Sequence, residues 1–307
     1  MKHFIDIADT SADEFIYLLD LADRLKAQHK SGRQHNNLNG KTLAMIFAKS
    51  STRTRISFEV GMKQLGGHAI YLNTQDIQLG RGESVADTAQ VLSRFVDAIM
   101  IRTFAHQDVL DLAECGSIPV INGLTDLMHP CQALADLMTV REHKGGLRGL
   151  KLAYLGDGNN VANSLLQACA RVGMDVAVAA PSGYTCDPAC IADAKKQAAR
   201  QGSSVLLTDD PVVAARNADV LYTDTWVSMG QEDEKQARIA VFNAYQVNAA
   251  IMAAAKPDAI FLHCLPAYRG LEVTSEVIDG PASVVFDEAE NRLHAQKAVL
   301  LHLLTGG

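Results

Sequence analysis

Short apolar runs alternate with amphipathic stretches along nearly the whole chain, and polar or glycine-containing turns separate them. The apolar runs predict a first series of strands at Thr42–Phe47, Ala69–Leu72, Ala98–Ile101 and Pro119–Ile121. They predict a second series at Lys151–Leu155, Asp175–Ala179, Val205–Leu207, Val220–Tyr222, Ile260–Leu262 and Ser283–Phe286. Helical patterns occupy Ser11–His29, Thr54–Leu65, Ser84–Phe95 and His106–Glu114. Strands that alternate with helices indicate βαβ units, so we expect an α/β fold with parallel sheets.

The two strand series predict two domains, each a parallel sheet flanked by helices. A chain of 307 residues is long enough for two domains. The break between the series falls in the helical pattern Cys131–His143 and the turn that follows it. We expect a first domain over residues 1–135, a second over 136–287, and a C-terminal helix over 288–307 that packs back on the first domain.

Composition and charge exclude several classes of protein. Hydrophobic residues make up 48% and charged residues 21% of the chain, which is the balance of a globular protein. The net charge of -7 and the lack of a basic block argue against a nucleic-acid partner. The uncharged stretch Ile239–Ala255 contains Asn243, Gln246 and Asn248, so we expect no membrane span. Six cysteines without a CxxC motif and an acidic N-terminal segment indicate a cytoplasmic protein with reduced thiols.

The residues that follow the strands are the candidate site residues, because ligands of open α/β sheets bind beyond the carboxyl ends of the strands. The first strand leads into Ser50–Arg55, where Ser51 or Thr52 can cap the next helix. Two arginines stand in the first turn of this helix, where the helix dipole disfavours cations. Arginines, hydroxyls and free backbone N–H groups together suit a bound phosphate. The alternative is a surface helix with arginines of no function.

Three further segments of the first domain carry candidate chemistry. Arg102 directly follows a strand and adds a cation at the same sheet edge. His129 and Gln132 flank the start of a helix, where an imidazole and an amide can polarise a carbonyl oxygen, although a single histidine is more often structural. The glycine-rich loop Gln78–Ser84 is either a ligand loop or a solvent-facing turn.

The first turn of the second domain resembles a dinucleotide fingerprint but departs from it. In Gly156–Val161, a valine stands where the third glycine belongs, and Ala179–Ser182 lacks the acid that holds a ribose. We therefore expect no dinucleotide cofactor. Asn159 and Asn160, at the switch into a helix, are candidates to hold a small polar ligand.

Two later strand ends of the second domain point to an amine ligand. Asp224 follows its strand closely and begins a loop rich in acids, which is either an ammonium site or a solvated acidic loop. His263 and Cys264 follow the next strand, but adjacent side chains diverge, so we expect no metal site. Cys264 would need a base nearby to act as a nucleophile, and we interpret it as a polar contact to substrate. Arg292 is either a surface cation or a further ligand of the anion.

Taken together, these segments resemble the ornithine carbamoyltransferases, in the order in which that family has them. The resemblance rests on Ser51–Arg55, Gln78–Gly80, Arg102, His129–Gln132, Gly156–Asn160, Asp224, Ser228–Gly230, His263–Pro266 and Arg292. It implies transfer of the carbamoyl group of carbamoyl phosphate to L-ornithine, without cofactor or metal. It also implies a first domain that binds carbamoyl phosphate, a second that binds the amino acid, and a homotrimer or a multiple of trimers.

The resemblance implies a role for each matching residue. Carbamoyl phosphate would be bound by Ser51, Thr52, Arg53, Thr54, Gln78, Arg102, His129, Pro130, Cys131, Gln132, Cys264, Leu265 and Arg292. Ornithine would be bound by Asn160, Asp224, Ser228 and Met229. The implied catalytic residues are Arg53, Arg102, His129, Gln132, Asp224 and Cys264. Cys131 occupies a position where the family often has threonine, and we expect its side chain to turn away from the reacting groups. The resemblance also implies that the Leu265–Pro266 bond is cis.

Three alternatives compete with this interpretation. An aspartate carbamoyltransferase needs cations for a dicarboxylate, whereas the second-substrate loop with Asp224 and Asp233 is acidic. A putrescine carbamoyltransferase also binds a diamine, and only Ser228–Gly230 favours a ligand with an α-amino acid head. The third alternative is a binding subunit without activity, which the intact set of candidate residues disfavours. The compact length favours arginine synthesis over arginine breakdown.

Overall fold

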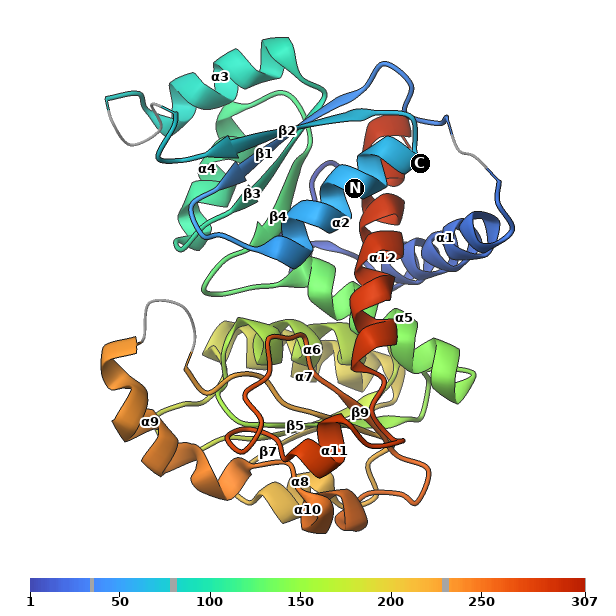
Figure 1. Ribbon diagram of the computed structural model, residues 1–307, viewed down its shortest axis with the longest axis vertical. Coiled ribbons are helices and arrows are strands. Elements are labelled where there is room, and N and C mark those ends of the chain that lie inside the picture. Colours follow the sequence, from blue (N-terminus) through green and yellow to red (C-terminus); the bar gives the residue numbers. More distant parts are fainter. Residues whose placement is uncertain (34–35, 78–81, 228–231, 307) are drawn as a thin grey trace. The chain divides into compact units, whose positions relative to one another are not determined.

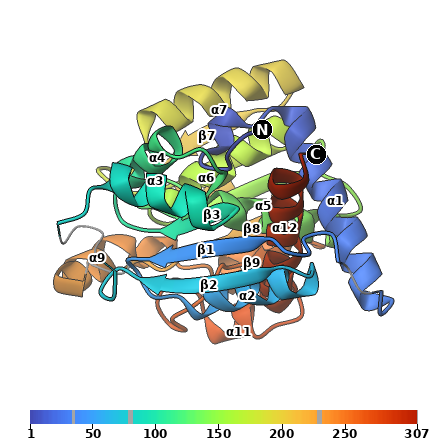
Figure 2. The ribbon, with the colours of Figure 1, turned by 90° about the horizontal axis from the view of Figure 1, so that it is seen from above.

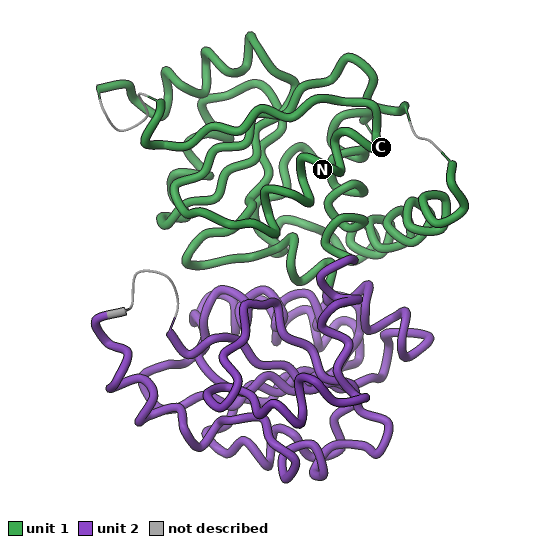
Figure 3. Tube along the Cα trace, viewed as in Figure 1, with its two compact units in different colours: residues 1–135, 291–307 green, residues 136–290 purple. Residues whose placement is uncertain are grey.

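The chain forms two compact units, which Figure 3 distinguishes by colour. The computed structural model describes residues 1–33, 36–77, 82–227 and 232–306. Unit 1 comprises residues 1–135 and 291–307, and unit 2 comprises residues 136–290. The chain therefore passes from one unit to the other twice, within helix α5 (Pro130–Lys144) and within helix α12 (Val285–Thr305).

Unit 1 is built on a four-stranded parallel sheet in the order β2-β1-β3-β4, with all four strands labelled in Figure 1. Figure 2 shows β1 and β2 of this sheet side by side. The strands are β1 (Thr42–Phe47), β2 (His68–Asn73), β3 (Ala98–Arg102) and β4 (Val120–Leu124). The helices of this unit are α1 (Ala12–Lys30), α2 (Thr52–Gln64), α3 (Val85–Phe95) and α4 (His106–Cys115), and a short 3-10 helix η1 (Ile7–Asp9) precedes them. Because β2 and β3 lie on opposite sides of β1, the segments that follow β1 and β3 meet at a switch point, where such sheets bind ligands.

Unit 2 is built on a five-stranded parallel sheet in the order β7-β6-β5-β8-β9. Its strands are β5 (Lys151–Leu155), β6 (Asp175–Ala179), β7 (Val205–Thr208), β8 (Val220–Tyr222) and β9 (Ile260–Leu262). The connecting helices are α6 (Asn160–Val172), α7 (Pro188–Gln201), α8 (Pro211–Ala215), η2 (Glu232–Glu234), α9 (Lys235–Phe242), η3 (Asn243–Tyr245), α10 (Ala249–Ala254) and α11 (Ser275–Ile278). Here β6 and β8 flank β5, so the switch point lies beyond β5 and β8.

The fold class predicted from the sequence is confirmed, but one predicted strand is wrong. Residues 283–286 form no strand: Ser283 makes a single bridge to Phe261, and α12 begins at Val285. The backbone N–H of Phe261 donates to the Ala282 carbonyl at 2.8 Å and that of Val284 donates to the Phe261 carbonyl at 3.0 Å, so the chain follows β9 for two bonds before it turns into the helix. Acids in the first turn of α12 suit a helix start, and its first valine is buried in the unit 2 core, which explains the apolar pattern.

Among the described residues, no helix is long and apolar enough to cross a membrane.

Candidate active site

The start of α2, just after β1, is the centre of the candidate site in unit 1. Ser51 caps the helix, and its hydroxyl accepts from the backbone N–H of Thr54 at 3.2 Å. The first turn of α2 contains no acid to neutralise the positive end of the helix dipole. The structure therefore offers a helix N-terminus suited to an anion, at the switch point of the unit 1 sheet.

Arg292 of α12 joins this helix start to α5. Its guanidinium donates through Nη1 to the Gln132 side chain and through Nη2 to the Thr54 hydroxyl, 3.3 Å away. All three side chains are buried. Residues separated by 160 and 238 positions in the sequence thus meet in one polar cluster, and the alternative of a surface cation at Arg292 is wrong.

His129 lies in the same cluster as a neutral imidazole. Burial lowers its pKa well below the usual value, and Arg292, Arg102 and Arg53 lower it further. These three arginines are therefore close enough to His129 to disfavour a positive charge on it. A neutral imidazole among arginines can donate a hydrogen bond to a carbonyl oxygen and needs no proton from solvent to do so.

Of the two arginines in the first turn of α2, the structure turns Arg55 away from this cluster. Its Nε pairs with Glu59 at 3.1 Å, and its guanidinium lies 3.9 Å from the ring centroid of Tyr71. The Arg55 side chain is 47% exposed. A phosphate at the helix start would thus meet Arg53 and not Arg55.

Sequence reasoning missed Lys49, a further cation that follows β1. It is buried, forms an ion pair with Asp126, and lies 4.0 Å from the ring centroid of Phe104. The signal was a lysine directly before the Ser50–Arg55 segment, but only the fold brings Asp126 beside it.

Pro130 and Cys131 form the first turn of α5, and Cys131 faces the sheet, as expected. Its thiol donates to the carbonyl oxygen of Asn122 at 3.5 Å. Burial raises the pKa of this thiol to about 12, so it stays protonated. Cys131 thus has a packing contact within unit 1.

The candidate site in unit 2 is centred on Asp224, just beyond β8. Its Oδ2 accepts from Asn159 Nδ2 at 2.8 Å, and its Oδ1 accepts from the Cys264 thiol at 3.1 Å. Asn159 also caps α6, because its Oδ1 accepts from the backbone of Val161 and Ala162. The strand ends of β5, β8 and β9 thus converge on one carboxylate. Asn160 is the first residue of α6, next to this contact.

The thiol of Cys264 is not an activated nucleophile. Burial raises its pKa well above the usual value, and the neighbouring charge of Asp224 raises it further. The thiol donates its hydrogen to this carboxylate at 3.1 Å. Cys264 is therefore suited to hydrogen bonding and not to covalent catalysis.

Among the described residues, Asp224, His263 and Cys264 place potential metal-ligand atoms within 4.8 Å of one another. The argument that adjacent histidine and cysteine side chains diverge is therefore wrong here. Two of these groups are used internally: His263 Nδ1 accepts from the backbone of Leu265, and the Cys264 thiol donates to Asp224. The expectation of no metal stays a prediction.

The loop after β8 is anchored by a buried ion pair. Arg238 of α9 pairs with Asp157 of the turn after β5, and its Nε donates to the backbone carbonyl of Trp226. The guanidinium also lies 5.0 Å from the ring centroid of Tyr184. This pair ties the segment that follows Asp224, at Trp226, to the turn after β5. The candidate residues Gln78, Ser228 and Met229 lie outside the described residues.

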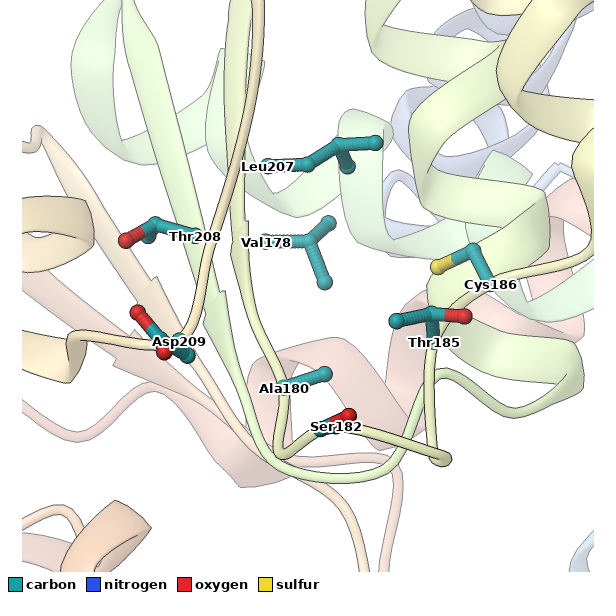
Figure 4. A pocket seen from close by; sticks show the side chains of 8 residues that line it. All are labelled: Val178, Ala180, Ser182, Thr185, Cys186, Leu207, Thr208 and Asp209. Atoms are coloured by element: carbon teal, nitrogen blue, oxygen red, sulfur yellow. The ribbon is translucent and has the colours of Figure 1, made fainter.

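A cavity of about 240 Å³ opens at the carboxyl ends of β6 and β7. Figure 4 shows Val178 and Leu207 projecting toward the segment that carries Thr185 and Cys186. The remaining lining residues are Ala180, Ser182, Thr208 and Asp209. None of the candidate site residues lines this cavity, so it is separate from the Asp224 cluster.

Comparisons with known proteins define the class. Residues 2–142 match the carbamoyl-P binding domain of aspartate/ornithine carbamoyltransferase, and residues 148–303 match the Asp/Orn binding domain. The chain belongs to the aspartate/ornithine carbamoyltransferase family.

Within this family, similar proteins are ornithine carbamoyltransferases. The one from Bacillus subtilis is 58% identical over 306 residues, which cover 100% of this chain and 95% of that protein. The structure of the Pyrococcus furiosus enzyme is 56% identical, with a TM-score of 0.97 over 100% of this chain and 97% of that chain. The structure of the anabolic enzyme from Campylobacter jejuni is 42% identical, with a TM-score of 0.94 over 100% of both chains. The resemblance found in the motifs is thereby confirmed.

Proposed function

We propose that the protein transfers the carbamoyl group of carbamoyl phosphate to the δ-amine of L-ornithine, giving L-citrulline and phosphate. The observation that carries this proposal is the identity of 58% to an ornithine carbamoyltransferase over the full chain. The two polar clusters support it, since unit 1 offers cations for a phosphate and unit 2 offers a carboxylate for an ammonium group.

Carbamoyl phosphate binds in unit 1. Its phosphate is held by the N-terminus of α2 with Ser51, Thr52, Arg53 and Thr54, and by Arg102. The neutral imidazole of His129 and the Gln132 amide lie at the start of α5, beside Pro130 and Cys131. They bind the carbamoyl oxygen, on which negative charge builds when the amine attacks. Arg292 holds the Gln132 and Thr54 side chains in place.

Ornithine binds in unit 2. The carboxylate of Asp224 attracts the δ-ammonium, whose reference pKa near 10.4 means that it must lose a proton before it can attack. Asn160, Ser228 and Met229 hold the amino acid head, and Cys264 and Leu265 complete the carbamoyl phosphate contacts. Gln78 joins the phosphate site.

The reaction needs neither cofactor nor metal. The amine nitrogen forms a bond to the carbamoyl carbon, the carbon–oxygen bond to phosphate breaks, and phosphate leaves with its charge neutralised by the arginines. The departing phosphate takes up the amine proton. Most of the rate comes from holding the two substrates in contact with the correct orientation.

We further infer that the enzyme is a cytoplasmic homotrimer, or a multiple of trimers, that serves arginine biosynthesis. Exposed apolar side chains on α3 support self-association, since Val91 is 43% and Phe95 is 77% exposed. All six cysteines lie in the described part of the chain and none forms a disulfide, which supports a reducing compartment. The likeness to an anabolic enzyme supports the biosynthetic role.

Comparison of Arg53→Ala with Arg55→Ala tests the phosphate half of this proposal. We expect the wild type to form citrulline and phosphate in equal amounts. Arg53→Ala should lower kcat/KM for carbamoyl phosphate by roughly 100- to 1,000-fold, because it removes a charged donor from the phosphate. Arg55→Ala, in the same turn but exposed, should stay within about threefold of the wild type. Near-normal activity of Arg53→Ala would contradict the assignment.

A further inference from the structure

A buried polar cluster in unit 2 holds the loop of residues 263–268, which follows β9 and carries Cys264. The carboxyl of Glu288 in α12 accepts from the backbone N–H of His263 at 2.8 Å and from the Tyr222 hydroxyl at 3.1 Å. The side chains of Glu288, His263 and Tyr222 are fully buried. Sequence reasoning gave none of these groups a role beyond noting His263.

The imidazole of His263 extends this support along the loop. Its Nδ1 accepts from the backbone N–H of Leu265 at 2.9 Å, which leaves the proton on Nε2. Nε2 lies 3.3 Å from the carboxylate of Glu272, which also accepts from the backbone of Tyr268 at 2.5 Å. The backbone N–H groups of residues 263, 265 and 268 therefore all donate hydrogen bonds to buried side chains.

The loop needs such support because its conformation is unusual. Leu265 has φ of 57°, a left-handed value that disfavours a branched side chain. Backbone of this kind persists only where the surroundings over-determine it, and it gathers at functional sites. The Leu265–Pro266 bond is cis, as the resemblance to the family implied.

Glu288 is itself held by Asp136 of α5. Burial raises the pKa of Glu288 well above its usual value, and the charge and hydrogen bond of Asp136 raise it further. Burial and the neighbouring carboxyl of Asp136 thus both favour the protonated form of Glu288.

We propose that Glu288 is a positioning residue for the carbamoyl transfer: together with His263 it fixes the 263–268 loop, so that Cys264 stays directed at Asp224. This inference rests on the proposed function, since Asp224 binds the ornithine amine there. Loss of Glu288 leaves the His263 N–H and the Tyr222 hydroxyl buried without their acceptor. The loop then relaxes, and the 3.1 Å contact between Cys264 and Asp224 opens.

Three variants test the proposal. Glu288→Ala removes the acceptor, Glu288→Gln keeps one oxygen to accept from His263, and Asp219→Ala is the matched control. Asp219 is also a buried carboxylate of unit 2, but it accepts from the backbone of Lys151, at the opposite end of the sheet, and pairs with Lys256. Two readouts are used: the KM for ornithine, and the rate at which iodoacetamide labels Cys264, measured by peptide mass spectrometry relative to Cys115.

We expect Glu288→Ala to raise the KM for ornithine about 10- to 100-fold, because small misplacements of binding groups have effects of that size. Labelling of Cys264 should accelerate at least several-fold relative to Cys115, whose environment in unit 1 is unchanged. Glu288→Gln should restore both values to within about threefold of the wild type. Asp219→Ala should lower the melting temperature and leave both readouts unchanged.

Wild-type values of both readouts in folded Glu288→Ala would overturn the proposal, and so would equal changes in Asp219→Ala. If Glu288→Ala does not fold, Tyr222→Phe removes only the hydroxyl that holds Glu288, and it should shift both readouts in the same direction by less. The labelling rate needs no turnover. A wild type that forms no citrulline would therefore contradict the proposed function. The labelling rate of Cys264 would still test whether Glu288 positions the 263–268 loop.

Discussion

The carboxylate of Asp224 accepts hydrogen bonds from Asn159, Thr225 and Cys264, so its orientation is fixed before any substrate binds. Asp224→Asn keeps the shape of the side chain but removes the charge that we propose attracts the ornithine ammonium. We expect kcat/KM for ornithine to fall roughly 10- to 100-fold, the size of one charge-assisted hydrogen bond. The KM for carbamoyl phosphate should stay within about threefold.

Steady-state kinetics with each substrate varied in turn checks this expectation. Asp279→Asn is the control, because Asp279 is an exposed carboxylate of the same unit that pairs with Arg269. An unchanged ornithine KM in Asp224→Asn, or an equal loss in Asp279→Asn, would show that the ammonium site lies elsewhere.

Lys297 of α12 gives unit 1 a pH-dependent stability. The side chain is buried and its Nζ donates to Gln64 of α2 at 3.0 Å. Burial lowers its pKa from 10.5 to about 8. Between these values the unfolded chain binds more protons than the native protein, so the free energy of unfolding contributed by this group rises with pH. Well below pH 8, Lys297 is protonated in both the native and the unfolded state, so it adds no pH dependence to the free energy of unfolding.

Chemical denaturation from pH 7 to pH 10.5 measures this effect. Lys297→Met has no titrating group at this position, so the free energy of unfolding of the wild type minus that of the variant should rise across the window from pH 8 to 10.5. A difference that stays constant with pH would contradict the lowered pKa of Lys297.

At the scale of elements, the turn between β5 and α6 depends on Gly158. Its backbone N–H donates to the Tyr184 carbonyl at 2.7 Å, and a Cβ here would lie 2.3 Å from backbone atoms of Thr185 and Cys186. Gly158→Ala should therefore destabilise the protein by about 3 kcal/mol or more, because the clash is with backbone that cannot rotate away. Gly146→Ala meets nothing within 4 Å and should have a much smaller effect. Equal melting temperatures of the two variants would show that the turn can shift.

The sequence predicted most elements because their ends are marked locally. Strands β1, β5, β6, β8 and β9 have the predicted bounds; Asp219 and Thr223 flank β8, for instance, and Gly156 follows β5. The segment 283–286 was wrongly predicted to be a strand. Its valines are buried where α12 begins, and this use of apolar residues becomes clear only from the position of β9 beside them. Local patterns do not distinguish these two uses of an apolar run.

The candidate site also contains residues that the sequence could predict and residues that it could not. Arg53, His129 and Asp224 could be predicted because they follow strands, where α/β sheets bind ligands. Glu288 could not, since its role depends on Tyr222, 66 positions away in the sequence. The ion pair of Lys49 likewise depends on Asp126, which is 77 positions away in the sequence.

At the scale of the whole molecule, the proposed trimer should depend on the apolar side of α3. Phe95 is 77% exposed in the single chain, and Phe95→Asp would place a charge in an interface that covers it. The wild type should have a mass of about 99 kDa, three times the 33.1 kDa chain, and Phe95→Asp should be monomeric. Light scattering after size-exclusion chromatography measures both masses.

Phe286→Asp is the matched control for this substitution. Phe286 is a phenylalanine of similar exposure, 74%, at the start of α12 in unit 2. We expect it to leave the wild-type mass unchanged. A trimeric Phe95→Asp, or a trimer lost only in Phe286→Asp, would place the interface away from α3.

Carbamoyl phosphate turnover with L-ornithine, putrescine and L-aspartate, measured in parallel, tests the function most directly. Both the phosphate and the ureido product are followed for each acceptor. We predict that citrulline forms from ornithine with a kcat/KM far above those for the other two acceptors. A preference for putrescine or aspartate would contradict the ornithine assignment, and no turnover with any acceptor would contradict the catalytic function itself.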